Sequence, residues 1–191
     1  NVVSSLSDVK TYKIIQNDTS NKVITNTSNE TFIINSGEGA TISDGSGSNV
    51  IRNGNENVSI SCGAGDDTVD TGGDDVTTEG GKGNDWIENH NNFGVFKYAA
   101  GDGNDTIVGF NEYSMLSITG GSYSTQVSGG DVIVKVGDGQ ILLQNTAHLS
   151  TIKINDANFM APSEIVTYNG HSYRLYNEKV TWEQADRKSV V

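Results

Sequence analysis

Three short turns near the middle of the chain hold the residues best suited to binding a metal ion. The turns read GAGDDTV, GKGNDWI and GDGNDTI, so each has two alternating glycines, then an aspartate, one further residue and an aliphatic residue. Calcium takes six to eight oxygen ligands, more than two carboxylates supply, so backbone carbonyls must turn toward the ion, and glycine permits such conformations. The pattern predicts calcium (Ca2+) sites formed by Gly63, Gly65, Asp67, Gly81, Gly83, Asp85, Gly101, Gly103 and Asp105.

An aliphatic residue recurs every nine positions before and through these turns. A nine-residue step equals one short strand plus one tight turn, so two steps make one coil of a flattened solenoid with the aliphatic side chains stacked inside. An amphipathic helix has a period of 3.6 and would not hold this phase. We therefore predict a parallel β-solenoid over residues 1–108, regular from residue 9. The recurring residues are Ile15, Ile24, Ile33, Ile42, Ile51, Ile60, Val69, Thr78 and Ile87, of which only Thr78 is not aliphatic.

Successive turns of such a solenoid alternate between its two edges, so only turns eighteen residues apart stack on the same edge. Asp67 and Asp85 have this spacing, whereas Asp105 follows Asp85 by twenty residues and needs a bulge to join the stack. The turn Thr71–Val76 faces the opposite edge and places Val76 at the ligand position, with its two acids earlier in the turn. We expect that turn to be a degenerate site.

The turns before Cys62 have a different chemistry. They are rich in Asn, Ser, Thr and Gly, which close tight turns through their own hydrogen bonds and their tolerance of left-handed backbone. We expect these coils to form a scaffold that needs no metal. The residues that occupy the ligand position there are Lys13, Lys22, Thr31, Ala40, Asn49 and Val58.

The stretch Cys62–Val108 resembles the calcium-binding repeats of the RTX (repeats-in-toxin) family. The resemblance implies a right-handed parallel β-roll with calcium in its turns, in secreted or bacterial cell-surface proteins whose repeats stay loose at low calcium. The sequence departs from the family pattern at Cys62, which replaces the first glycine, in the turn Thr71–Val76, and in the twenty-residue spacing before Asp105.

Beyond Val108 the pattern changes to short alternating runs separated by glycine-containing turns. The segment DVIVKV-GDG-QILLQ predicts a β-hairpin with Val132, Val134 and Val136 on one side, and it fits this region better than a continued nine-residue step. We predict that residues 109–160 form an antiparallel β-meander that caps the open end of the roll. The fold class expected for the whole chain is all-β.

A third segment follows Pro162. Residues 161–191 are expected to be a linker and a tail, and VTYNGHSYRLYNEKVTWEQADRK resembles the opening of a C-type lectin-like domain, with a helix beginning after Thr181 as its N-cap. That resemblance implies sugar binding through parts of a lectin domain that this segment does not include.

Composition and the remaining reactive residues argue against several functions. The net charge of −12 opposes binding to the phosphates of nucleic acids and favours divalent cations. No apolar run is long enough to span a membrane. The three histidines, His90, His148 and His171, are scattered, and Cys62 is interpreted as a small residue in a glycine position. No catalytic arrangement is apparent, so we expect no enzyme activity.

The sequence therefore predicts a calcium-stabilised structural module of a secreted or cell-surface protein, related to adhesion or surface display, whose further partner is a glycan or protein ligand. Two alternatives remain open. The chain is an appended module of a carbohydrate-binding or carbohydrate-active protein, or it is a structural solenoid that binds no metal.

Overall fold

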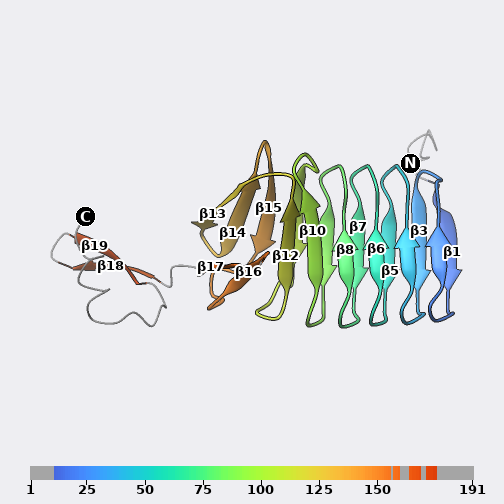
Figure 1. The fold of residues 1–191 in the computed structure, drawn as a ribbon, viewed down its shortest axis with the longest axis horizontal. Coiled ribbons are helices and arrows are strands. Elements are labelled where there is room, and N and C mark those ends of the chain that lie inside the picture. The colour runs from blue at the N-terminus through green and yellow to red at the C-terminus, as the bar shows by residue number, and fades with distance from the viewer. Residues whose placement is uncertain (1–10, 156, 160–163, 169–170, 176–191) are drawn as a thin grey trace, which may run out of the picture.

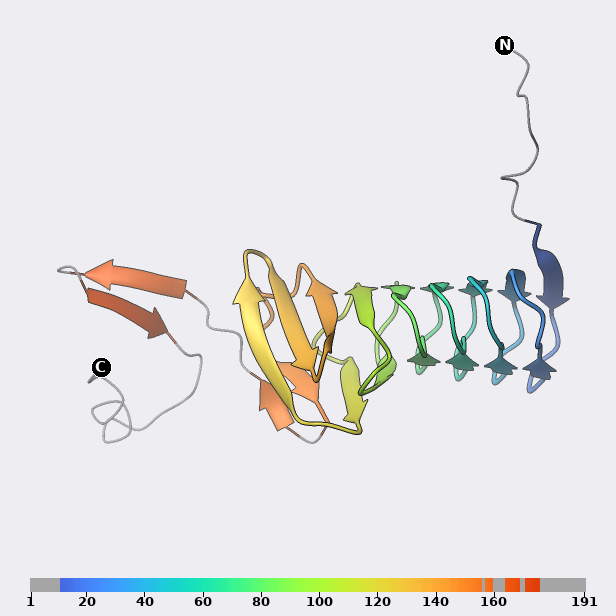
Figure 2. The same ribbon diagram turned by 90° about the horizontal axis from the view of Figure 1, so that it is seen from above.

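The computed structural model describes residues 11–155, 157–159, 164–168 and 171–175. The strands between residues 13 and 159 form a flattened solenoid in which two β-sheets face one another, seen from the side of the stack in Figure 1 and from above in Figure 2. The predicted all-β solenoid with antiparallel strands at its C-terminal end is confirmed. No helix in the described part of the chain has the length and apolar character needed to cross a membrane.

The nine-stranded sheet, here called sheet A, begins with six parallel strands that are eighteen residues apart until the last, which follows by twenty. They are β1 (Lys13–Asn17), β3 (Thr31–Asn35), β5 (Val50–Asn53), β7 (Thr68–Thr71), β9 (Trp86–Asn89) and β11 (Asn104–Val108). The facing eight-stranded sheet, sheet B, also begins with six parallel strands. They are β2 (Val23–Thr25), β4 (Thr41–Ser43), β6 (Ser59–Ser61), β8 (Thr77–Glu79), β10 (Val95–Ala99) and β12 (Met115–Thr119).

The core is the double column of residues predicted from the nine-residue step. In sheet A, Ile33 pairs with Ile51, which pairs with Val69, and each of these three side chains is fully buried. In sheet B, Ile60 pairs with Thr78. Thr78 is as buried as its aliphatic neighbours, so the core column continues through the one position that is not aliphatic. Stacking like on like in this way removes apolar area from water at every coil.

The two extra residues before Asp105 lengthen β10. This strand has five residues where β8 has three, and it continues through Tyr98 and Ala99 before the chain turns. The longer strand still pairs in register with β8 from Val95 to Lys97, so the insertion widens the coil without breaking the stack.

The region after Val108 differs in part from the predicted antiparallel meander. The predicted hairpin is present, because β14 (Asp131–Val136) pairs antiparallel with β15 (Gly139–Gln144), and Val132, Val134 and Val136 are fully buried. The strand β13 (Tyr123–Ser128) adds a further antiparallel edge.

Parallel pairing nevertheless continues beyond residue 108. The strand β12 pairs parallel with β10, β15 pairs parallel with β11, and β16 (Ile152–Ile154) pairs parallel with β12. The strand β17 (Ala157–Phe159) pairs antiparallel with β16. The solenoid therefore takes one more coil, and the hairpin β13–β14 is inserted within it. Because β15 follows β11 by thirty-six residues, or four nine-residue steps, the inserted hairpin changes the order of the strands but keeps the nine-residue step in phase.

In the tail, β18 (Glu164–Tyr168) and β19 (His171–Leu175) pair as an antiparallel hairpin in a sheet of their own. The predicted helix after Thr181 and the linker residues 161–163 lie outside the described residues.

We predict that shortening one residue of the core column destabilises the whole solenoid. Ile51 is fully buried, so Ile51→Ala is expected to cost about 2 to 5 kcal/mol of unfolding free energy, measured by chemical denaturation in a fixed buffer. Ile14→Ala is the matched control, because Ile14 is 69% exposed and should change stability by less than about 1 kcal/mol. Equal losses in the two variants would contradict the assigned register.

Candidate metal centre

The three predicted turns lie together on one edge of the solenoid, where the chain passes from sheet B to sheet A. We call this row the acidic edge. Each of its turns has six residues, and a residue is described below by its position, first to sixth, within its turn. The turns of the acidic edge are residues 44–49, 62–67, 80–85 and 100–105, and the turn 26–31 continues the row toward the N-terminus.

The sixth residues of these turns form a ladder of hydrogen bonds along the acidic edge. The amide of Asn49 donates to Oδ1 of Asp67 at 2.7 Å, and the amide of Asp67 donates to Oδ1 of Asp85 at 2.8 Å. The amide of Asp85 donates to Oδ1 of Asp105 at 3.1 Å. All three predicted aspartates therefore belong to one ladder, and the twenty-residue spacing does not exclude Asp105.

Each aspartate uses only one carboxylate oxygen in this ladder. Asp67 and Asp85 are each 2% exposed, and Oδ2 of both is buried with no hydrogen-bond partner among the described residues. A buried carboxylate oxygen without a partner is costly, because the charge has lost its hydration and gained nothing in return. Two such oxygens in successive coils fit the needs of a divalent cation that binds oxygen.

The pKa values of the ladder aspartates reflect the same cost of burying a carboxylate. Burial raises the pKa of Asp67 from 3.8 to about 8, and the charges of neighbouring aspartates, Asp85 first, add to the increase. Burial likewise raises the pKa of Asp85 to about 6 and of Asp105 to about 7, although each accepts a stabilising backbone hydrogen bond. Without a positive partner the ladder therefore favours protonated carboxyl groups.

The predicted glycines bring neighbouring turns into contact. All six have positive φ angles, from +95° at Gly81 to +144° at Gly83. A Cβ atom at Gly63 would collide with the carbonyl oxygen of Gly45, and one at Gly81 would collide with the carbonyl oxygen of Gly63. Glycine is therefore required by conformation and by space. The last turn is looser, since a Cβ at Gly101 would meet nothing within 4 Å.

Side chains alone do not complete a site. Within the described residues, no group of three or more His, Cys, Asp or Glu side chains is placed to hold one ion. A cation on the acidic edge would need carbonyl oxygens of the turns in addition to carboxylates, which is the division of ligands expected for glycine-rich turns.

Protein groups close the C-terminal end of the row. The hydroxyl of Tyr98 donates to the carbonyl oxygen of Gly103 at 2.6 Å, and the amide of Gln140 donates to the same oxygen at 3.0 Å. The amide of Ala99 donates to Oδ2 of Asp102 at 2.6 Å. These residues lie outside the predicted ligand positions. The two-residue insertion, which contains Tyr98 and Ala99, is the feature of the sequence that points to them.

The opposite edge has a different chemistry. Nδ2 of Asn17 donates to Oδ1 of Asn35 at 2.7 Å, and Nδ2 of Asn35 donates to Oδ1 of Asn53 at 2.8 Å. Each amide supplies both donor and acceptor, so this ladder is neutral and satisfies itself. In the turn Thr71–Val76, Val76 is buried at the ligand position, and Oδ1 of Asp74 accepts the amide of Asn92.

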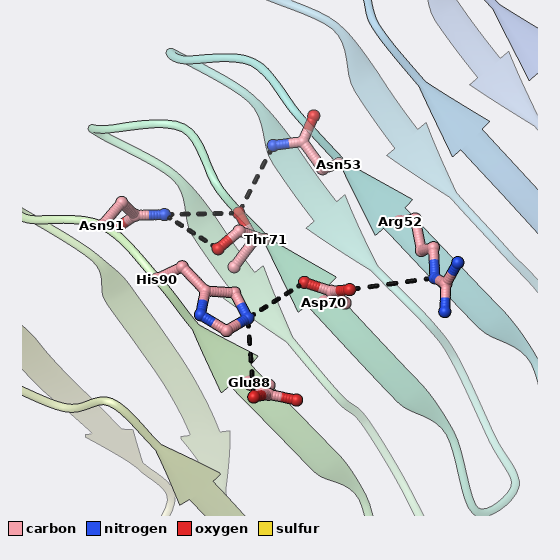
Figure 3. A network of polar contacts seen from close by, with 7 residues as sticks. All are labelled: Arg52, Asn53, Asp70, Thr71, Glu88, His90 and Asn91. Carbon is pink, nitrogen blue, oxygen red and sulfur yellow. Dashed lines mark hydrogen bonds and ion pairs between the residues drawn. The ribbon is translucent and has the colours of Figure 1, made fainter.

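Two other reactive side chains among the described residues, Cys62 and His90, have different surroundings. Cys62 is fully buried, and burial raises the pKa of its thiol, which opposes thiolate chemistry. His90 lies in an exposed polar network (Figure 3), with Nε2 at 3.4 Å from Asp70 and 3.5 Å from Glu88, while Arg52 contacts Asp70 at 3.8 Å. Exposed pairs of this kind contribute little to stability.

The fold defines the chain as a parallel β-solenoid with an acidic, glycine-rich edge. A comparison with known protein families gives no match, and no curated protein is significantly similar to the chain.

We predict that the metal-free protein becomes less stable as the pH rises from about 4 to about 8. The unfolded carboxyl groups lose their protons near pH 4, whereas Asp67, Asp85 and Asp105 hold theirs in the folded state up to pKa values of about 8, 6 and 7. The folded state then binds more protons, so stability is highest at the acidic end of this window. Melting temperatures in calcium-free buffer would measure the trend, and Asp67→Asn should weaken it. A melting temperature independent of pH would contradict the buried ladder.

We also predict a sharp difference between two glycine substitutions. Gly81→Ala forces a Cβ against the carbonyl of Gly63 at a positive φ and is expected to cost about 1 to 3 kcal/mol or more. Gly72→Ala is the control on the opposite edge, where the nearest atom to a Cβ is 3.8 Å away and the φ angle is not positive. Urea denaturation of both variants, with and without calcium, would measure the contrast. Comparable losses would argue against tight stacking of the acidic edge.

Proposed function

We propose that the acidic edge binds Ca2+ and that the bound ions stabilise the folded β-roll. The observation that carries the proposal is a pair of buried Oδ2 atoms, of Asp67 and Asp85, in successive glycine-rich turns. Neither atom has a hydrogen-bond partner in the described part of the chain. The resemblance of Cys62–Val108 to RTX repeats supports the same reading, because these turns stack along one edge as that pattern requires.

The donor set favours calcium over other metals. The edge offers carboxylate and carbonyl oxygens, which suit calcium, and histidine is absent from its turns. Zinc prefers nitrogen and sulfur ligands, and the one cysteine in the row is a buried thiol whose pKa is raised. Magnesium needs a small octahedral site with several waters, which an adaptable row of turns does not provide.

The proposed role of the metal is structural. Without a cation the buried carboxylates repel one another, and with a cation the free energy of binding becomes free energy of folding. Extracellular calcium modules bind with dissociation constants on the order of 10⁻⁴ to 10⁻³ M, which suits a secreted or cell-surface location. We therefore propose a calcium-stabilised structural module of a secreted or surface protein, without catalysis of its own.

Thermal unfolding in calcium and in chelator tests the proposal. At a free calcium concentration ten times the dissociation constant, one bound ion adds about 1.4 kcal/mol, which raises the melting temperature by about 3 to 6 °C. Magnesium at the same concentration controls for ionic strength. An identical melting temperature in calcium and in chelator would reject calcium as a stabilising ligand.

Two matched variants locate the effect. Asp85→Asn keeps the Oδ1 acceptor for the amide of Asp67 but removes the charge, so it should reduce the rise in melting temperature. Asp74→Asn makes the same change on the opposite edge, where Oδ1 accepts the amide of Asn92, and should leave the rise unchanged. An equal effect of the two variants would show that calcium acts through overall charge and not through the acidic edge.

A further inference from the structure

The turns of the acidic edge each contribute a buried carboxylate, but the first turn does so from a different position. The turns 62–67 and 80–85 have their aspartate at the sixth position, as Asp67 and Asp85. In the turn 44–49 the sixth residue is Asn49, and the first residue is Asp44. The pattern of an aspartate at the sixth position therefore does not identify this turn.

The carboxylate of Asp44 is held firmly by one oxygen and left unpartnered at the other. Its side chain is 6% exposed. Oδ1 accepts hydrogen bonds from Nδ2 of Asn26 at 2.6 Å and from the amide of Gly45 at 2.9 Å. Oδ2 is buried and has no hydrogen-bond partner among the described residues. It is thus in the same condition as Oδ2 of Asp67 and Asp85.

In two turns of the row, the first position lies directly beside the side chain of the sixth position. In the turn 26–31, Nδ2 of Asn26 donates to Oγ1 of Thr31 at 2.7 Å, so the first residue reaches the sixth. In the turn 80–85, a Cβ atom at Gly80 would collide with the carboxylate of Asp85. A carboxylate at position 44 therefore enters the column that holds Asp67 and Asp85 in the following coils.

The turns 44–49 and 62–67 are in direct contact. The amide of Ala64 donates to the carbonyl of Gly45 at 2.9 Å, and the amide of Gly47 donates to the carbonyl of Ala64 at 2.8 Å. The amide of Asn49 donates to Oδ1 of Asp67. After burial and the charge of Asp85, the charge of Asp44 also contributes to the raised pKa of Asp67, as expected for carboxylates in neighbouring coils.

We propose that a further cation site lies between the turns 44–49 and 62–67, with Oδ2 of Asp44 and Oδ2 of Asp67 as its carboxylate ligands. The inference rests on the proposed calcium function and extends the row of ions by one coil toward the N-terminus. The ligand class is the same, a divalent cation that binds oxygen, with carbonyl oxygens of the two turns completing its shell. Cys62, at the first position of the second turn, adds a small neutral group beside the site.

Counting bound calcium tests the site. After equilibrium dialysis of the full chain against calcium buffer, elemental analysis should find one ion fewer per chain in Asp44→Asn than in the unchanged protein. The substituted asparagine keeps an Oδ1 acceptor for Asn26 and Gly45, so the turn retains its hydrogen bonds. Asp74→Asn is the control on the opposite edge and should bind as many ions as the unchanged protein.

A rescue variant keeps the test decisive where Asp44→Asn also weakens the fold. Adding Asn49→Asp to Asp44→Asn returns one carboxylate to the turn at the sixth position, and this double variant should recover the lost ion. A double variant that folds but still lacks that ion would overturn the proposed site.

The remaining outcomes separate this inference from the calcium function itself. If Asp44→Asn binds as many ions as the unchanged protein while Asp85→Asn loses at least one, the further site is rejected and the calcium function stands. If the unchanged protein binds no calcium, both proposals fail together.

Discussion

The structure depends on the stacking of buried carboxylates along one edge of a solenoid. In a parallel roll, equivalent positions of successive coils lie side by side. Aspartates at equivalent positions therefore place their negative charges next to one another. Asp67, Asp85 and Asp105 each accept the amide of the residue one coil earlier, and this bond fixes their position without neutralising them. The fold thus concentrates negative charge where water is excluded, and a positive partner or a proton must compensate.

The two edges of the roll show two solutions to the same geometric problem. Each edge must pair the polar groups of a tight turn with those of the next coil. On one edge asparagine does this alone, because Asn17, Asn35 and Asn53 pass a hydrogen bond from coil to coil. On the acidic edge the aspartate side chains are acceptors only, and Oδ2 of Asp67 and of Asp85 has no hydrogen-bond partner among the described residues. This difference between amide and carboxylate is the reason for proposing the metal site on the acidic edge and not on the opposite edge.

Much of this arrangement could be predicted from the sequence, because a solenoid converts a spacing along the chain directly into a contact in space. The step of nine placed Ile33, Ile51 and Val69 in one column, and the step of eighteen placed Asp67 beside Asp85. This relation between spacing and contact no longer holds where an insertion interrupts the repeat. The hairpin β13–β14 is inserted between two strands of the solenoid, so β11 pairs in parallel with β15, thirty-six residues further on, and not with the strand eighteen residues further on.

The sequence pattern also did not identify two side chains near the acidic edge, for a reason that concerns side chains and not spacing. Asp44 and Tyr98 reach the acidic edge from outside the expected ligand positions, one from the first residue of its turn and the other from a lengthened strand. A repeat pattern describes which backbone positions are equivalent. A carboxylate or hydroxyl can reach the same part of the acidic edge from a backbone position that is not equivalent. Tyr98 donates a hydrogen bond to the carbonyl oxygen of Gly103, the last of its column, whereas the carbonyl oxygen of Gly83 faces Gly103 in the next turn. The end of the row is therefore set by a side chain that interrupts the repeat.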